Sequence, residues 1–219
     1  MKEVELPSDL KARLLKQIEQ KPAPTRRTEM FRASLLVAGS IAIGLVIFLV
    51  RGGIRMTGRP TSLIVGTSLG TALIAGVGTW MALGRRRSML GRSSLALCVT
   101  ALVTPLALLF WKVVWSSQYP GGLDPWPGRI GFRCLNLSLL MGVLPLVALL
   151  FARRGTDPTH PRLAGLSAGA SVGLCVALFV DMWCPVGYVP HFLIGHILPI
   201  ALLALAGLWF GKVLLPPRK

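Results

Sequence analysis

The chain has 219 residues, of which 53% are hydrophobic and only 15% are charged, whereas an average soluble domain is about 25% charged. Its 24 Lys and Arg against 8 Asp and Glu give a net charge of +16, which by itself would be typical of a nucleic-acid-binding protein. The basic residues, however, stand in clusters that are poor in aromatic side chains and lie between long apolar runs, which argues against direct nucleic-acid binding and for a protein that crosses a membrane several times.

Six apolar runs follow one another, and each is close to the roughly 20 residues that a helix needs to cross a bilayer. Backbone groups in lipid must hydrogen-bond within their own segment, so each run is predicted to be a helix. The first run begins only after a polar tail, so it is not a cleaved signal peptide. The predicted fold class is all-α integral membrane: a bundle of six transmembrane helices (33–219) behind a cytoplasmic tail (1–32) with a short amphipathic helix. The expected spans are 33–50, 61–83, 93–114, 134–152, 163–183 and 191–211.

The placement of charge sets the expected orientation. Eighteen of the Lys and Arg residues fall in the two terminal tails and in the second and fourth connections, and six fall in the other three connections. Cytoplasmic loops carry the excess of positive charge, so both termini are predicted to be cytoplasmic. Attraction to anionic lipid head groups then explains the basic loops. The first outer connection, with Arg51, Arg55 and Arg59, is the one exception.

Two of the expected spans carry glycines at intervals of four residues. Small residues at this spacing let helix backbones approach closely. Packing within the bundle is the favoured interpretation, and a homodimer through these faces is the alternative. The glycines are Gly66 and Gly70 in the second span and Gly165, Gly169 and Gly173 in the fifth.

Three prolines, Pro105, Pro145 and Pro199, lie inside the expected spans and should kink their helices. No inverted repeat and no charge-lined path is visible in the sequence, which argues against a transporter. There is also no Ser–His–Asp arrangement, no HExxH and no phosphate-binding Gly-rich loop. The chain is therefore predicted not to be an enzyme.

The N-terminal tail is the one segment that can meet a soluble partner. Ser8 or Asp9 can cap a helix behind Pro7. Leu10, Leu14 and Ile18 then recur every four residues, with Leu15 beside them. A helix of about twelve residues is marginal alone in water, so we expect its apolar stripe to lie in a groove on another protein. Attachment to the membrane surface and disorder are the alternatives.

The stretch VDMWCPVGYVPHFLIGH places Asp181, Cys184, His191 and His196 among large apolar residues near the predicted outer surface. Ionisable groups in spans are candidates for function. One thiolate, two imidazoles and a carboxylate suit zinc or another transition metal, and two His can instead bind haem. The corresponding hypothesis is a metal- or haem-binding membrane redox or sensor protein.

Two expectations about this stretch concern its geometry. His191 and His196 are five residues apart, about 140° around an α-helix, so they are not expected to share a face. A neighbouring span would then have to complete the site. The alternative to a binding site is that these polar side chains hydrogen-bond one another and cap helix ends. Cys134 also falls near the outer face, where a disulfide with Cys184 is conceivable.

The order of several stretches resembles that of six-span bacterial membrane anti-sigma factors, the negative regulators of extracytoplasmic-function sigma factors, with the pattern of myxobacterial members. These stretches are LKARLLKQIEQKPAPTRR, WMALGRRRSMLGR, TPLALLFWK, WPGRIGFRCLNLSLLMGVLPLVALL, RRGTDPTHP and CPVGYVPHFLIGHILP. The resemblance implies that the tail holds a sigma factor at the membrane, away from RNA polymerase, until an envelope, light or oxidative signal releases it.

The tail positions that match this family lie between Leu10 and Glu19. The implied sigma-binding side chains are Leu10, Arg13, Leu14, Leu15 and Ile18. Another anti-sigma class carries a zinc motif of the form His-x3-Cys-x2-Cys in its soluble domain. The tail contains neither Cys nor His, so that class is excluded.

Overall fold

The structure is a computed structural model that describes residues 26–54, 60–83, 93–119, 130–155, 159–184 and 188–216. Its described residues form helices and connections without a strand, which confirms the all-α prediction. The helices are α2 (Arg26–Val50), α3 (Thr61–Leu83), α4 (Ser94–Cys98), η1 (Val99–Val103), α5 (Thr104–Ser117), α6 (Phe132–Ala152), α7 (Pro161–Trp183), α8 (Val189–Phe192), η2 (Leu193–Ile197) and α9 (Leu198–Leu214). The expected tail helix lies outside the described residues.

Five helical rods are long and apolar enough to cross a membrane. They are α3, α6 and α7 together with two composite rods, Ser94–Ser117 (α4, η1 and α5) and Val189–Leu214 (α8, η2 and α9). Their bounds lie within three residues of the expected spans. The sixth helix, α2, contains a shorter apolar stretch, Ser34–Val50.

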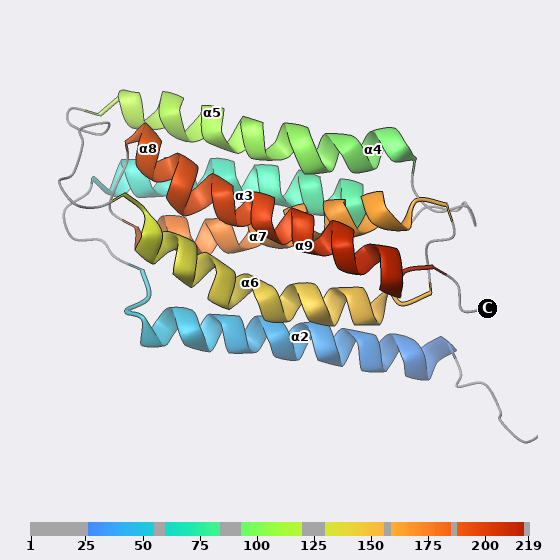
Figure 1. The fold of residues 1–219 in the computed structure, drawn as a ribbon. Helices are drawn as coiled ribbons and strands as arrows, with labels where there is room; N and C mark the ends of the chain where they lie inside the picture. Colours follow the sequence, from blue (N-terminus) through green and yellow to red (C-terminus); the bar gives the residue numbers. More distant parts are fainter. Residues whose placement is uncertain are drawn as a thin grey trace, which may run out of the picture.

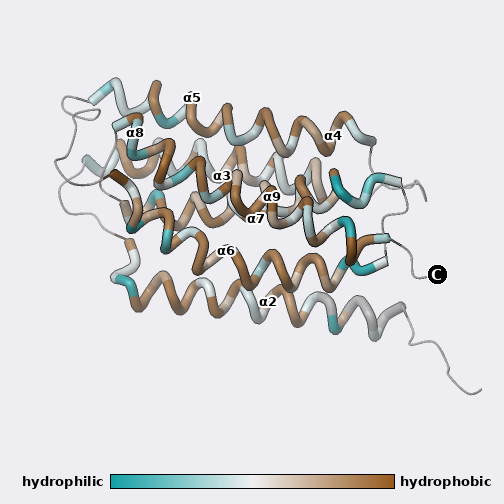
Figure 2. The backbone as a smooth tube through the Cα atoms, in the orientation of Figure 1, coloured by the Kyte–Doolittle hydropathy of each residue, from teal (hydrophilic) through white to brown (hydrophobic). Residues whose placement is uncertain are grey.

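The rods lie roughly parallel or antiparallel in one bundle (Figure 1). Helix α7 is the most buried of the five candidate spans and packs against α9, α3 and α6. Helix α2 lies at the edge of the bundle, mainly against α6. Hydrophobic residues cover the length of the rods, and the hydrophilic ones gather toward their ends (Figure 2). Large apolar side chains such as Leu73, Leu106 and Leu205 point outward and are exposed, as expected of a surface that faces lipid.

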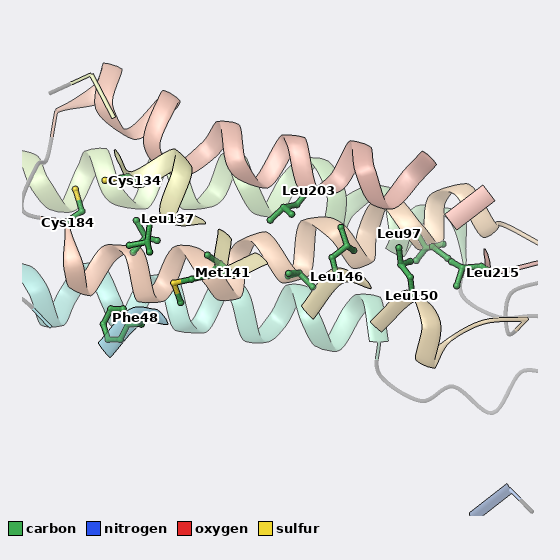
Figure 3. Close-up of a cluster of buried hydrophobic side chains, with 14 residues drawn as sticks. Phe48, Leu97, Cys134, Leu137, Met141, Leu146, Leu150, Cys184, Leu203 and Leu215 are labelled. Carbon is green, nitrogen blue, oxygen red and sulfur yellow. The ribbon is translucent and has the colours of Figure 1, made fainter. Parts of the chain in front are cut away.

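A cluster of buried apolar side chains fills the space between α2, α6, α7 and α9 (Figure 3). Phe48 of α2 meets Phe179 of α7 edge to face, with ring centroids 5.5 Å apart. Leu137, Met141 and Leu146 of α6 continue the cluster along the bundle. Two of the cysteines discussed above, Cys134 and Cys184, lie at one end of it.

The glycine stripe of α7 is the contact surface for α9. A Cβ added to Gly165 would overlap the backbone of Gly207, and one added to Gly169 would overlap the carbonyl oxygen of Leu203. The two backbones therefore touch directly, which is how small residues hold helices together in lipid.

The glycines of α3 face two tryptophans of α5. The indoles of Trp111 and Trp115 stack with centroids 5.5 Å apart, and they occupy the space that a side chain at Gly70 or Gly66 would need. Trp111 Nε1 also donates to the carbonyl oxygen of Gly66 at 3.1 Å. Both glycine faces are thus covered within the chain, as the favoured interpretation of the sequence required.

Two of the three prolines follow a turn of π-helix rather than a simple kink. The π turns η1 and η2 end two residues before Pro105 and Pro199. Proline has no N–H for the preceding turn, and its ring clashes with the carbonyl four residues earlier. A wider turn relieves that clash, and Leu198 N–H accordingly reaches back to the carbonyl oxygen of Leu193.

The contact between α7 and α9 predicts a specific loss of stability. Gly169→Ala should lower the free energy of unfolding by about 1–3 kcal/mol, because the added methyl group meets backbone that cannot rotate away. The matched control is Gly39→Ala on α2, where an added Cβ has nothing within 4 Å; its stability should be unchanged or slightly raised. Thermal unfolding of both variants in detergent compares them, and equal stability would contradict the packing described here.

Candidate functional site

Six polar or thiol side chains are buried together at one end of the bundle, where α5 and α7 end and α6 and α8 begin. Each has less than 5% of its surface exposed. They are Lys112, Cys134, Asp181, Cys184, His191 and His196. Burial of this many polar groups is costly unless they satisfy one another, so their mutual contacts decide what the site is.

Four of these residues form what we name the thiol–imidazole cluster: Cys134, Cys184, His191 and His196. Their ligand atoms all lie within 4.8 Å of one another. His191 Nε2 lies between the two thiols, 3.0 Å from the Sγ of Cys184 and 3.4 Å from the Sγ of Cys134. Both cysteines are free thiols, so the cluster is a set of four separate donors rather than a disulfide with two histidines beside it.

The π turn η2 corrects the expectation that His191 and His196 cannot share a face. Five residues are about 140° apart on an α-helix, but a π turn is closed by hydrogen bonds between residues five apart. His191 and His196 therefore come to the same side, with ring centroids 5.6 Å apart. The expectation was wrong because the helix is not regular here: Pro199 is preceded by a π turn.

Two glycines bring the start of α6 close enough for Cys134 to join. Gly131, just before α6, has a φ of 112°, which disfavours any other residue. A Cβ on Gly131 would also lie 2.8 Å from the backbone nitrogen of Gly195, and one on Gly195 would lie 3.0 Å from the Cβ of Cys134. The close approach of these two backbones places Cys134 beside His191.

Asp181 does not belong to the thiol–imidazole cluster, although the sequence analysis grouped it there. Its carboxylate forms a buried ion pair with Lys112 of α5 and accepts a hydrogen bond from Thr71 Oγ1 of α3 at 2.9 Å. Lys112 is fully buried. The pair therefore joins three helices, α3, α5 and α7, beneath the cluster.

Lys112 also links the ion pair to the cluster. Its ammonium nitrogen lies 3.0 Å from Nδ1 of His196, and it lies over the ring of Phe192, 5.2 Å from the centroid. An ammonium group only donates, so Nδ1 must accept and the neutral ring carries its proton on Nε2. That Nε2 is buried and has no hydrogen-bond partner among the described residues.

This arrangement suits a soft transition-metal ion. Two thiolates and imidazole nitrogens are the ligands of zinc and related metals, and their tetrahedral sites need ligand atoms a few ångströms apart. The buried Nε2 of His196, which has no hydrogen-bond partner among the described residues, can become a metal ligand only once it has lost its proton. The tight packing of thiols around His191 favours a single ion over a haem macrocycle. Ligation by His196 Nε2 would require the ring proton to move to Nδ1, which breaks the contact with Lys112.

Comparison with known proteins adds the family. A model of the family described as negative regulator of sigma F matches residues 18–216. The chain belongs to this family. The anti-sigma-F factor NrsF of Caulobacter vibrioides is 30% identical over 133 residues, which are 60% of this chain and 58% of that relative. No solved structure matches the chain.

The contacts of two residues in this site, Lys112 and Cys134, were not predicted from the sequence. Lys112 was counted among the charges of an outer connection, although it lies in the rod Ser94–Ser117. The sequence feature that could have revealed its role is the isolated Lys in the apolar run ALLFWKVVW, since a charged side chain inside a span requires a partner. Cys134 was considered only for a disulfide. Its distance from Cys184 in the chain hid the contact that Gly131 makes possible.

The buried ion pair of this NrsF-family chain predicts non-additive stability. Lys112→Met should destabilise the protein by about 3–5 kcal/mol, because it leaves the Asp181 carboxylate buried and unpaired. The double variant Lys112→Met/Asp181→Leu should recover most of that loss. Lys212→Met, at an exposed position of α9, is the control and should change little. The free energy of unfolding of the three variants is measured in mixed micelles. If the losses of the two substitutions simply added in the double variant, the buried ion pair would be contradicted.

Proposed function

We propose that this chain is a membrane-bound anti-sigma factor that holds an extracytoplasmic-function sigma factor through its N-terminal tail and releases it on a signal at the inner membrane. The observation that carries the proposal is the family match over residues 18–216, on a chain with five helices apolar enough to span a bilayer. Transcription is negatively regulated while the sigma factor is held, and no catalytic step is required of the chain.

A six-span topology with both termini in the cytoplasm fits the shape of the bundle. Helix α2 has 25 residues, and its apolar stretch Ser34–Val50 is about 25 Å long by helical rise, at the short end of what a span needs. The start of α2 and the C-terminus lie at the same end of the molecule (Figure 1), as an even number of spans requires. Arg153 and Arg154 follow α6 at this end and Lys212 lies in the last turn of α9, in agreement with the positive-inside rule.

The sigma factor is proposed to dock on the apolar stripe of the tail. The stripe consists of Leu10, Leu14, Leu15 and Ile18, with Arg13 beside it. The family match begins at residue 18, so most of this segment precedes it and rests on the sequence pattern alone. Two further predictions rest on the sequence pattern alone. One is a resemblance to the light-response factor CarR of myxobacteria, and the other is that light, envelope or oxidative stress is the signal. A homodimer through the glycine faces is not proposed, because α9 and α5 cover those faces.

The docking prediction has a matched control within the tail. Leu14→Asp and Leu10→Asp should abolish co-purification of the sigma factor, because each places a charge in the apolar stripe. Ala12→Asp introduces the same charge about 160° around the helix from Leu14 and should leave capture intact. Sigma factor co-expressed with the tagged full-length chain and recovered from membranes is the measurement. Equal recovery with Leu14→Asp and Ala12→Asp would rule out docking through this face.

A second function is proposed for the thiol–imidazole cluster: it binds a soft metal ion as the sensor of the anti-sigma factor. The supporting observation is that four buried donors lie within 4.8 Å of one another. Ligation by Cys134 and His196 would draw α6 toward η2 and break the contact between His196 and Lys112. Binding would therefore change how α5, α6 and α9 meet, which is what a switch requires.

Metal binding can be tested on the purified full-length chain with cobalt, whose thiolate complexes absorb visibly. Cys134→Ser and Cys184→Ser should each remove the thiolate absorption or weaken binding by about 10-fold or more, since each deletes a ligand. The control is Cys98→Ser, because Cys98 lies outside the cluster and binding should persist. If stoichiometric binding survived the loss of both Cys134 and Cys184, the metal would bind elsewhere and the thiol–imidazole cluster would not be the metal site.

A further inference from the structure

An apolar groove of about 820 Å³ opens between α2, α3, α6 and α7. It exists because α2 packs mainly on α6, whereas α3 packs on α7 and α5, so that α2 and α3 stand apart. Small residues on the facing sides widen it, among them Gly44 of α2 and Ala72 and Gly76 of α3. The groove lies well within the helices that span the membrane, away from the thiol–imidazole cluster.

The lining decides what can fill the groove. It is almost entirely hydrocarbon. Its polar side chains are Thr79 and Cys175, whose Oγ1 and Sγ lie 3.5 Å apart, and Ser171, whose hydroxyl donates to the carbonyl oxygen of Ser167. Water needs two to four polar partners, which this surface does not offer. An empty space of this size would forfeit the dispersion contacts of its walls. Its volume lies in the range of small-molecule sites.

We propose that the groove binds an anionic membrane phospholipid, with one acyl chain between α2 and α3. The apolar lining of the groove matches the acyl chain of the lipid, and a basic side chain at one end of the groove matches an anionic head group. Val37, Leu83 and Leu149 line the end of the groove nearest the start of α2. Arg154 follows α6 at the same end, five residues after Leu149, and is exposed. Basic side chains at this depth attract anionic head groups.

Glycines provide a blocking variant and its control. A Cβ added to Gly76 meets nothing within 4 Å, and Gly76 is part of the groove lining, so a leucine there projects into the groove and blocks part of it. A Cβ added to Gly39 also meets nothing within 4 Å, but Gly39 is not part of the groove lining. Both substitutions raise helix propensity, so Gly76→Leu and Gly39→Leu should fold equally well.

The test is native mass spectrometry of the full-length chain after exchange with vesicles of phosphatidylglycerol or phosphatidylcholine. The parent and Gly39→Leu should retain phosphatidylglycerol, and Gly76→Leu should lose most of it. Arg154→Gln should weaken retention by about fivefold, the factor expected for one basic residue near a lipid surface. Equal retention by Gly76→Leu and Gly39→Leu would overturn the site, and equal retention of the two lipids would overturn the anionic head group.

A second measurement does not depend on any substitution in the groove. Cys175 is exposed in the groove wall, so bound phosphatidylglycerol should slow its reaction with an apolar maleimide. In the background Cys98→Ser/Cys134→Ser/Cys184→Ser, Cys175 is the single thiol that remains. A rate that phosphatidylglycerol leaves unchanged would refute the proposal. Neither experiment involves a sigma factor, so their outcome is independent of the proposed function.

Discussion

The ion pair between Lys112 and Asp181 is the main constraint on the structure of this end of the bundle. A fully buried ammonium group carries a desolvation cost of several kcal/mol even after relaxation. The ammonium group contacts Asp181, Nδ1 of His196 and the face of Phe192. Thr71 donates a hydrogen bond to the carboxylate of Asp181. Together with Lys112 itself, these partners come from four different rods, so the cost is offset only when all four are correctly placed. The pair therefore selects one arrangement of the helices rather than adding much to stability.

Glycines and a proline, which act through the backbone, produce that arrangement. The glycine stripe of α7 fixes its distance from α9, and the π turn before Pro199 turns His196 to the side of His191. Gly131 then lets α6 start against this turn, which brings in Cys134. Substitution of any of these residues would move donors that it does not touch. The thiol–imidazole cluster thus depends on proline and glycine positions as much as on its own cysteines and histidines.

These dependences explain which parts of the structure the sequence predicted. Spans follow from local composition, and the bounds of α3 were predicted to the residue. Asp181, Cys184, His191 and His196 were found because polar groups stand out in an apolar run. Their partition into an ion pair and a donor cluster was not predicted. It depends on the contacts of Lys112 and Thr71 with Asp181 and of Cys134 with His191, all between residues far apart in the chain. The shared face of His191 and His196 was missed because helical periodicity assumes a regular turn.

The same structure constrains how a signal at the cluster would reach the tail. Helix α7 has 23 residues, about 35 Å of length, and its backbone is packed directly on α9, so these two helices move together. Helix α2, which continues from the tail, packs mainly on α6, and α6 carries Cys134 in its first turn. On its other side α2 faces the groove, where a lipid chain yields more easily than a packed helix. Movement of α6 on ligation would therefore pass to α2, and α2 is the helix that the bundle holds least firmly.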